Sequence, residues 1–217
     1  ETPMETIPSN LAMEEAAAVP YGTLTALPFL RDNGKLRTGQ KILIIGASGS
    51  VGSFAVQLAR HMGAEVTGVC GPSNVELVRS LGASQVIDYT KEDFTAGEEI
   101  YDVVFDSVGK SSFGQTTRIL KPGGVYLTTV LSLTILLNML WTSSFGRKKA
   151  QIAFTGLRPN GGKLKDLTWI IQLCEQGAVR PVIDRQYSLN QIVEAHRYVD
   201  EGHKKGNVVI TVDHNSK

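Results

Sequence analysis

Short apolar runs alternate with segments of helical periodicity along most of the chain. Residues 41–46 form the first run, which is short and continuously apolar after its lysine, as expected of a parallel strand covered on both faces. Residues 51–62 then carry apolar side chains every three or four positions, which predicts a helix. Further strands are predicted at residues 65–70, 84–88, 101–106, 124–129 and 151–155, and further helices at residues 73–81, 111–120 and 163–175.

This alternation of strands and helices predicts the fold class. Parallel strands joined through helices make right-handed crossovers, so helices cover both faces of the sheet. We therefore expect an α/β protein with a doubly wound parallel sheet, the Rossmann fold, over residues 21–178. Beyond it, residues 181–187 and 207–212 are predicted as extended and residues 190–201 as helical. These elements are either a small satellite unit or pieces of a second domain.

A glycine-rich turn joins the first strand to the first helix. Gly46 permits a tight exit from the strand, Gly49 lets the main chain approach a pyrophosphate, and Gly52 lets the helix pack closely. The N–H groups at the start of the helix favour phosphate. Between a strand and an amphipathic helix, this spacing predicts a dinucleotide-binding loop. The predicted cofactor-binding residues of the loop are Gly46, Ser48, Gly49, Ser50, Val51 and Gly52.

The end of the second strand bears on which dinucleotide binds. Sites for NAD usually place Asp or Glu there, because a carboxylate holds the ribose 2′-hydroxyl and repels a 2′-phosphate. No acid occurs between Val66 and Val75. We therefore expect NADP(H) as the cofactor, with Ser73 and Asn74 as candidate donors to the 2′-phosphate. Arg79 is a third candidate, but a solvated helix face is the simpler interpretation of its side chain, and Ser73 is also suited to cap the following helix.

Composition narrows the classes of partner. The 217 residues are 42% hydrophobic, and 22 basic against 21 acidic residues give a net charge of +1. So close a balance predicts neither a nucleic acid nor a membrane as partner. Two cysteines cannot form a disulfide framework, so we expect a cytoplasmic location. Residues 123–146 are uncharged, but polar side chains interrupt them, so we expect a buried strand followed by an apolar lid or subunit contact.

Further motifs follow one another along nearly the whole chain. They are EEAAAVP (residues 14–20), LTAL (24–27), LGA (81–83), VIDY (86–89), YDVVFDSVG (101–109), KPGG (121–124) and GH (202–203). Together with the glycine loop, this series resembles the medium-chain dehydrogenase/reductase superfamily, and within it the zinc-independent quinone oxidoreductase-like group. The resemblance implies that an N-terminal GroES-like catalytic domain is missing from this chain. Residues 1–20 would then be a remnant and linker of that domain, and residues 179–217 would return toward it.

The resemblance also implies positions along the cofactor for residues outside the glycine loop. Ser73 and Tyr89 would lie near the adenosine 2′-phosphate, although Tyr89 is equally well interpreted as a strand-end aromatic that packs on a helix. The residues expected toward the nicotinamide are Val108, Gly109, Thr25 and Thr128. Members of the family often have lysine in the closing strand where this chain has Asn207, so a contact made by that lysine does not carry over.

No metal site and no covalent nucleophile are predicted. The histidines show no ligand spacing, and no cysteine lies near residues 16–26, where zinc-binding members of the superfamily place a ligand. Cys70 is interpreted as a small buried residue. The histidines are His61, His196, His203 and His214.

The predicted activity is hydride transfer from NADPH to a quinone, enone or similar conjugated carbonyl, with catalytic residues that the sequence does not identify. Because one wall of the cleft is missing, this chain is expected to bind cofactor without turnover. The main alternative is a nucleotide-binding sensor or structural protein with a reductase-like fold; a methyltransferase is less compatible, because it would need an acid after the second strand. The resemblance further implies a homodimer through the strand from Gln151 to Thr155.

Overall fold

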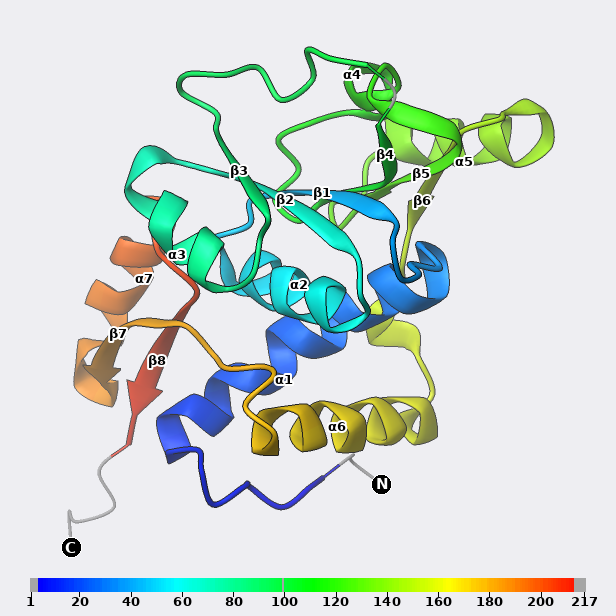
Figure 1. Cartoon of the computed structure of the whole chain (residues 1–217). Helices are drawn as coiled ribbons and strands as arrows, with labels where there is room; N and C mark the ends of the chain where they lie inside the picture. The colour runs from blue at the N-terminus through cyan, green and yellow to red at the C-terminus, as the bar shows by residue number, and fades with distance from the viewer. Residues whose placement is uncertain (1–3, 99, 213–217) are drawn as a thin grey trace, which may run out of the picture.

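The computed structural model describes residues 4–98 and 100–212 and centres on a six-stranded sheet (Figure 1). The strand order is β3-β2-β1-β4-β5-β6, and every neighbouring pair is parallel. This is the order of the Rossmann fold and confirms the predicted fold class. The strands are β1 (Lys41–Ile45), β2 (Glu65–Cys70), β3 (Gln85–Asp88), β4 (Tyr101–Asp106), β5 (Leu120–Thr128) and β6 (Lys149–Ile152).

Helices cover both faces of the sheet because successive strand residues point to opposite faces and both sets are apolar. In β1, Ile42 and Ile44 belong to one core, and Leu43 and Ile45 belong to the other. The first core lies under α1 (Met13–Pro28), α2 (Ser50–His61), α3 (Val75–Ser80) and α6 (Asn160–Glu175). The second lies under α4 (Phe113–Thr116) and α5 (Leu133–Phe145). Short helical turns occur at Phe29–Asn33, Pro72–Asn74 and Thr155–Leu157.

Two predicted elements have different bounds in the structure. The helix expected over residues 111–120 is reduced to α4, because residues 108–111 are held as a loop and β5 already begins at Leu120. The strand expected from Gln151 to Thr155 is instead β6, which ends at Ile152. Ile152 pairs with Thr128, the last residue of β5, so the neighbouring strand offers no partner to the residues that follow.

The C-terminal elements form a small unit of their own. It consists of β7 (Ile183–Ser188), a turn at Leu189–Gln191, α7 (Ile192–Asp200) and β8 (Asn207–Thr211). Its two strands, expected at residues 181–187 and 207–212 either in a small unit or as pieces of a second domain, pair with each other in parallel. An isolated bridge between Gly49 and Gly206 attaches this unit to the glycine loop. Helix α1 runs through residue 20 without a break, and the division into domains stays a prediction.

The uncharged stretch after residue 123 forms most of β5 and then α5. Within residues 4–98 and 100–212, no helix combines the length and the apolar character needed to cross a bilayer.

Candidate dinucleotide site

The turn after β1 brings main-chain atoms into close contact. Gly46 has a φ of +77°, and a Cβ there would lie 2.6 Å from a Val108 methyl carbon. A Cβ on Gly52 would lie 2.0 Å from the Gly46 carbonyl oxygen. Only glycine fits both positions, because the first needs left-handed backbone and the second puts the helix against the turn. The start of α2 is thereby held at the carboxyl edge of the sheet.

The main chain of this turn remains accessible at Gly49, which precedes α2 as its N-cap residue. A Cβ on Gly49 would touch only the Gly46 carbonyl oxygen, at 3.4 Å. The first N–H groups of α2, at Ser50 and Val51, have no acceptor within the helix. Such N–H groups and the helix dipole together favour a phosphate.

The end of β2 is joined to the loop through one amide side chain. Asn74 is buried, and its Nδ2 donates to Ser48 Oγ at 3.1 Å. Its Oδ1 is buried without a hydrogen-bond partner among the described residues. A buried acceptor without a hydrogen bond destabilises the folded protein, and a hydroxyl of a bound ribose would donate the missing hydrogen bond to Asn74 Oδ1. With the amide rotated by 180°, the same position offers an N–H₂ group to a phosphate. The residues present therefore fit a dinucleotide.

Three other predicted adenosine-side residues differ in their surroundings. Ser73 is exposed within the turn Pro72–Asn74 and does not cap α3, because Asn74 holds the N-cap position. Arg79 forms a surface ion pair with Glu76 at 2.5 Å, which agrees with its interpretation as part of a solvated helix face. Tyr89 is half exposed, and its hydroxyl lies 3.2 Å from the point where a Cβ of Gly71 would stand.

Asp88 is an acid outside the segment from Val66 to Val75, but it lies on the neighbouring strand β3. Asp88 ends β3 opposite Cys70, the last residue of β2. Hydrogen bonds from the Thr90 hydroxyl and N–H lower the pKa of Asp88, and Lys91 Nζ lies 3.7 Å away. Burial, with Asp88 beside it, raises the pKa of Cys70 to about 11. The Cys70 thiol therefore stays protonated at neutral pH and is not an activated nucleophile.

Asp106 organises the loop after β4, and sequence reasoning did not select it. The residue is fully buried, and its carboxyl oxygens accept N–H bonds from Val108 (3.1 Å), Gly109 (2.7 Å) and Ser111 (2.7 Å). These bonds place Val108 against Gly46, so both loops meet at one edge of the sheet. The available signal was a polar residue closing an apolar strand immediately before the motif Ser-Val-Gly.

Tyr126 and Thr128 support this loop from β5. Burial raises the pKa of Tyr126 to about 12, so its hydroxyl remains a donor, to the Ser111 carbonyl at 3.1 Å and Asp106 at 3.3 Å. Thr128 pairs with Asp106 in the sheet, is buried, and accepts the Val130 N–H at 3.2 Å. Its hydroxyl is therefore already engaged in the turn that follows β5.

The C-terminal unit contributes groups beside the glycine loop. The Gly206 N–H donates to the Ser48 carbonyl at 2.7 Å, and Ser50 Oγ donates to Asn207 Oδ1 at 2.5 Å. Lys204 Nζ donates to the Gly206 carbonyl at 2.6 Å, and burial lowers the pKa of this lysine. Asn207 thus binds the loop at the position where the resemblance led us to expect lysine, and Lys204 is a nearby cation that the motif did not reveal.

Thr25 is not joined to the loop by the bonds that the structure shows. Its hydroxyl donates back to the Tyr21 carbonyl of the same helix at 2.7 Å. Gly22 of α1 lies close to the start of α2, because a Cβ there would lie 2.9 Å from the Ser50 carbonyl oxygen. A role of Thr25 near the nicotinamide stays a prediction.

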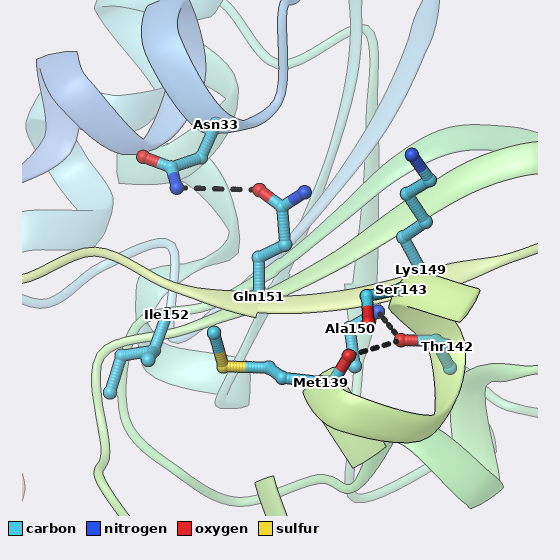
Figure 2. Close-up of a pocket in the computed structure, with 8 residues that line it drawn as sticks. All are labelled: Asn33, Met139, Thr142, Ser143, Lys149, Ala150, Gln151 and Ile152. Carbon is cyan, nitrogen blue, oxygen red and sulfur yellow. Dashed lines mark hydrogen bonds between the residues drawn. The ribbon is translucent and has the colours of Figure 1, made fainter. Parts of the chain in front are cut away.

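Two depressions on the described surface lie away from the glycine loop. One follows the edge strand β6, where Asn33 donates to Gln151 at 3.3 Å and Thr142 accepts the Ala150 N–H (Figure 2). The other lies between α4 and α5. Over the described part of the chain, no three His, Cys, Asp or Glu side chains gather closely enough to hold a metal ion.

A Rossmann sheet with a glycine turn of this geometry at its carboxyl edge defines the class of dinucleotide-binding domains. The family model described as zinc-binding dehydrogenase matches residues 81–210, so the chain belongs to that family. It corresponds to the cofactor-binding half of medium-chain dehydrogenases/reductases.

Relatives agree with this assignment. The chain is 33% identical to the mitochondrial NAD(P)H oxidoreductase RTN4IP1 of Mus musculus, covering 94% of this chain and 57% of that protein. It is 35% identical to 2-methylene-furan-3-one reductase of Solanum lycopersicum, covering 94% and 48%. The quinone oxidoreductase structure from Coxiella burnetii superposes with a TM-score of 0.83 at 26% identity, covering 96% and 64%. The chain therefore spans about half the length of these curated relatives.

Replacing Asp106 by asparagine tests whether the buried carboxyl holds the loop after β4. The asparagine amide keeps one acceptor oxygen, but its N–H₂ group replaces the second oxygen and faces main-chain N–H groups that need an acceptor. We therefore expect the free energy of unfolding to fall by about 3 kcal/mol. Urea unfolding followed by circular dichroism measures the change. Asp93→Asn is the control, because Asp93 makes a similar turn with Thr95 on the exposed surface, and it should leave stability nearly unchanged. Equal stability of the two variants would contradict the role given to Asp106.

Proposed function

We propose that the whole protein is an NADPH-dependent, zinc-independent oxidoreductase that transfers a hydride to a quinone, enone or similar conjugated carbonyl. The observation that carries this proposal is the open glycine turn at the carboxyl edge of the sheet, with Asn74 beside it. Names of relatives support the chemical class: one is an NAD(P)H oxidoreductase, one a reductase and one a quinone oxidoreductase. The cofactor supplies the hydride, and this chain orients and binds it.

The choice of NADPH rests on the end of β2. Cys70 is followed by Gly71, Pro72, Ser73 and Asn74, so no carboxylate is supplied there to repel a 2′-phosphate. Asp88 on the next strand is kept ionised by its hydrogen bonds from Thr90, which lower its pKa, and the cation that faces it is Lys91 at 3.7 Å. Exposed Ser73 and the amide of Asn74 are the candidate phosphate donors, and the ring of Tyr89 borders the same position.

Zinc independence is proposed because the described residues supply no metal-binding cluster and Cys70 is a buried thiol. Both cysteines are free and buried, which suits a reducing compartment such as the cytoplasm. The second candidate is a sensor or structural protein that binds the nucleotide only. It is favoured because Asp106, which binds the N–H groups of Val108 and Gly109, has both carboxyl oxygens engaged by N–H groups and by the Ser111 and Tyr126 hydroxyls, so this acid is not free to serve as a proton donor.

Calorimetric titration with NADPH and NADH tests the cofactor proposal. We expect this chain to bind NADPH more tightly than NADH. Ser73→Asp should weaken NADPH binding at least tenfold, about 1.4 kcal/mol, through repulsion of the 2′-phosphate, and should change NADH binding little. Ser80→Asp adds the same charge at the exposed end of α3 and is the control. Tighter binding of NADH than of NADPH by the unaltered chain would exclude the proposed preference.

The 217-residue chain is expected to bind NADPH without turning over. Its glycine loop has one wall from the sheet and a second from the small C-terminal unit, and the chain spans about half the length of its curated relatives. Oxidation of NADPH by benzoquinone, followed at the nicotinamide absorbance, should be found only with the whole protein. Fast quinone reduction by this chain alone would contradict the proposal. A whole protein that binds NADPH but reduces neither quinone nor enone would favour the sensor.

We further propose a homodimer in which β6 of one copy pairs with β6 of the other. β6 is the last strand of the sheet, and an unpaired strand edge binds a second strand readily. Sedimentation equilibrium should therefore show a dimer at high protein concentration. A monomer throughout the accessible concentration range would refute this contact.

A further inference from the structure

Helix α5 turns its more apolar face away from the protein. Its inner face packs on β6, where Ile135 is buried and Thr142 accepts the Ala150 N–H. The outer face carries Leu133, Leu137 and Leu140, which recur at helical spacing and are 73%, 57% and 70% exposed. Trp141 is 64% exposed beside them. We call the exposed side chains Val130, Leu131, Leu133, Leu136, Leu137, Leu140 and Trp141 the apolar stripe.

A surface helix normally buries its apolar side and presents polar groups to water. A contiguous exposed patch of large apolar side chains marks a surface that binds another protein, a membrane or a ligand. α5 lies at the periphery of the molecule in Figure 1, on the opposite side from the C-terminal unit formed by β7, α7 and β8. The part of the stripe on α5 is thus remote from the unit that is attached to the glycine loop, and only Val130, at the start of the stripe, lies beside the predicted cofactor residue Gly109.

The distribution of acidic and basic residues indicates what kind of partner binds the apolar stripe. No acidic residue occurs between Asp106 and Asp166, although the chain as a whole is almost neutral. The basic residues of this stretch are Lys110, Arg118, Lys121, Arg147, Lys148, Lys149, Arg158, Lys163 and Lys165. Some of them are matched by acids elsewhere, as Lys121 is by Asp102 and Arg158 is by Asp166.

Basic residues flank the stripe in the sequence, on both its N-terminal and its C-terminal side. Lys110 is exposed and follows Gly109, where a Cβ would lie 2.5 Å from Val130. Arg147 and Lys149 come directly after α5. Arg147 also lines the depression between α4 and α5 together with Trp141. A leucine and tryptophan surface flanked by cations is the pattern of segments that lie in the interface of an anionic bilayer.

A second copy of the chain fits this surface less well. A two-fold contact through the stripe would bring the basic ends of both copies together, and like charges repel. A membrane-spanning role is excluded by length, because α5 has 13 residues and is about 20 Å long.

We propose that the apolar stripe binds the surface of an anionic lipid bilayer. α5 lies in the plane of the interface, its leucines and Trp141 enter the boundary of the acyl chains, and Lys110, Arg147 and Lys149 contact lipid phosphates. This proposal departs from the expectation of no membrane partner, which rested on the net charge of the whole chain. It is independent of the proposed reductase activity.

Vesicle cosedimentation of the 217-residue chain tests the proposal. Vesicles of phosphatidylcholine with phosphatidylserine should bind the chain, pure phosphatidylcholine should bind it much less, and added salt should weaken binding. Leu137→Gln with Leu140→Gln should reduce affinity at least tenfold. Leu157→Gln, at an exposed leucine outside the stripe, is the matched control. Arg147→Gln with Lys149→Gln should reduce affinity about 25-fold, at about fivefold for each cation.

The control for that double variant is Arg60→Gln with Arg197→Gln, which removes two exposed cations on α2 and α7. Tryptophan fluorescence gives a second readout, because the chain has two tryptophans. Emission should shift to the blue on binding, and Trp141→Phe should abolish the shift. Failure to bind anionic vesicles, or binding that the stripe variants leave unchanged, would overturn the proposal. A dimer that dissociates in the stripe variants, without vesicle binding, would assign the stripe to a subunit contact instead.

Discussion

The rest of this site depends on how closely main-chain atoms approach one another at the turn after β1. Gly46, Gly52 and Gly206 each lack the space for a Cβ, which would lie 2.6, 2.0 and 2.2 Å from its nearest neighbour. The Gly52 contact holds the start of α2 against the end of the strand, and the Gly206 contact packs the turn before β8 against Val182, from where the Gly206 N–H donates to Ser48. The contacts of Gly52 and Gly206 are made with backbone, which cannot yield cheaply, and Gly46 is also required by its left-handed φ of +77°. The position of the helix N-terminus, and with it the place offered to a phosphate, follows from this packing.

Asp106 holds the loop after β4, which faces the glycine turn at the same carboxyl edge of the sheet. A buried carboxyl group that accepts several N–H bonds holds residues 108–111 in one conformation, and Val108 then closes against Gly46. The two loops are therefore formed before any ligand arrives. A site ordered in advance does not spend binding free energy on ordering its loops.

The fold and the glycine turn could be predicted from sequence because both rest on local rules. Apolar runs such as residues 41–45 identify buried parallel strands, and glycines at positions 46, 49 and 52 are required by backbone geometry. Asp106, Lys204 and Asn207 were not predicted as members of the site. Asn207 bonds to Ser50 across 157 positions, which no local pattern signals, and Asp106 was signalled only by its place at the end of an apolar strand. The short α4 was also missed, because a network centred on one buried acid displaced the helical propensity of its neighbours.

The positions of the charged residues explain more about this molecule than its net charge does. A net charge of +1 is compatible with two very different surfaces: one with mixed signs throughout, and one with acids and bases segregated. In this chain acids are absent from the 59 positions that separate Asp106 from Asp166, and two of the bases there are paired with acids from elsewhere. A shorter gap in the acids, from residue 66 to residue 75, leaves the end of β2 without a carboxylate of its own, and Asp88 of β3 lies opposite Cys70. In both places the missing acid matters because an anion is the expected neighbour: a 2′-phosphate at the sheet edge and lipid phosphates along α5. The same electrostatic argument therefore links the cofactor preference to the surface that α5 presents, although the two sites lie on different parts of the fold.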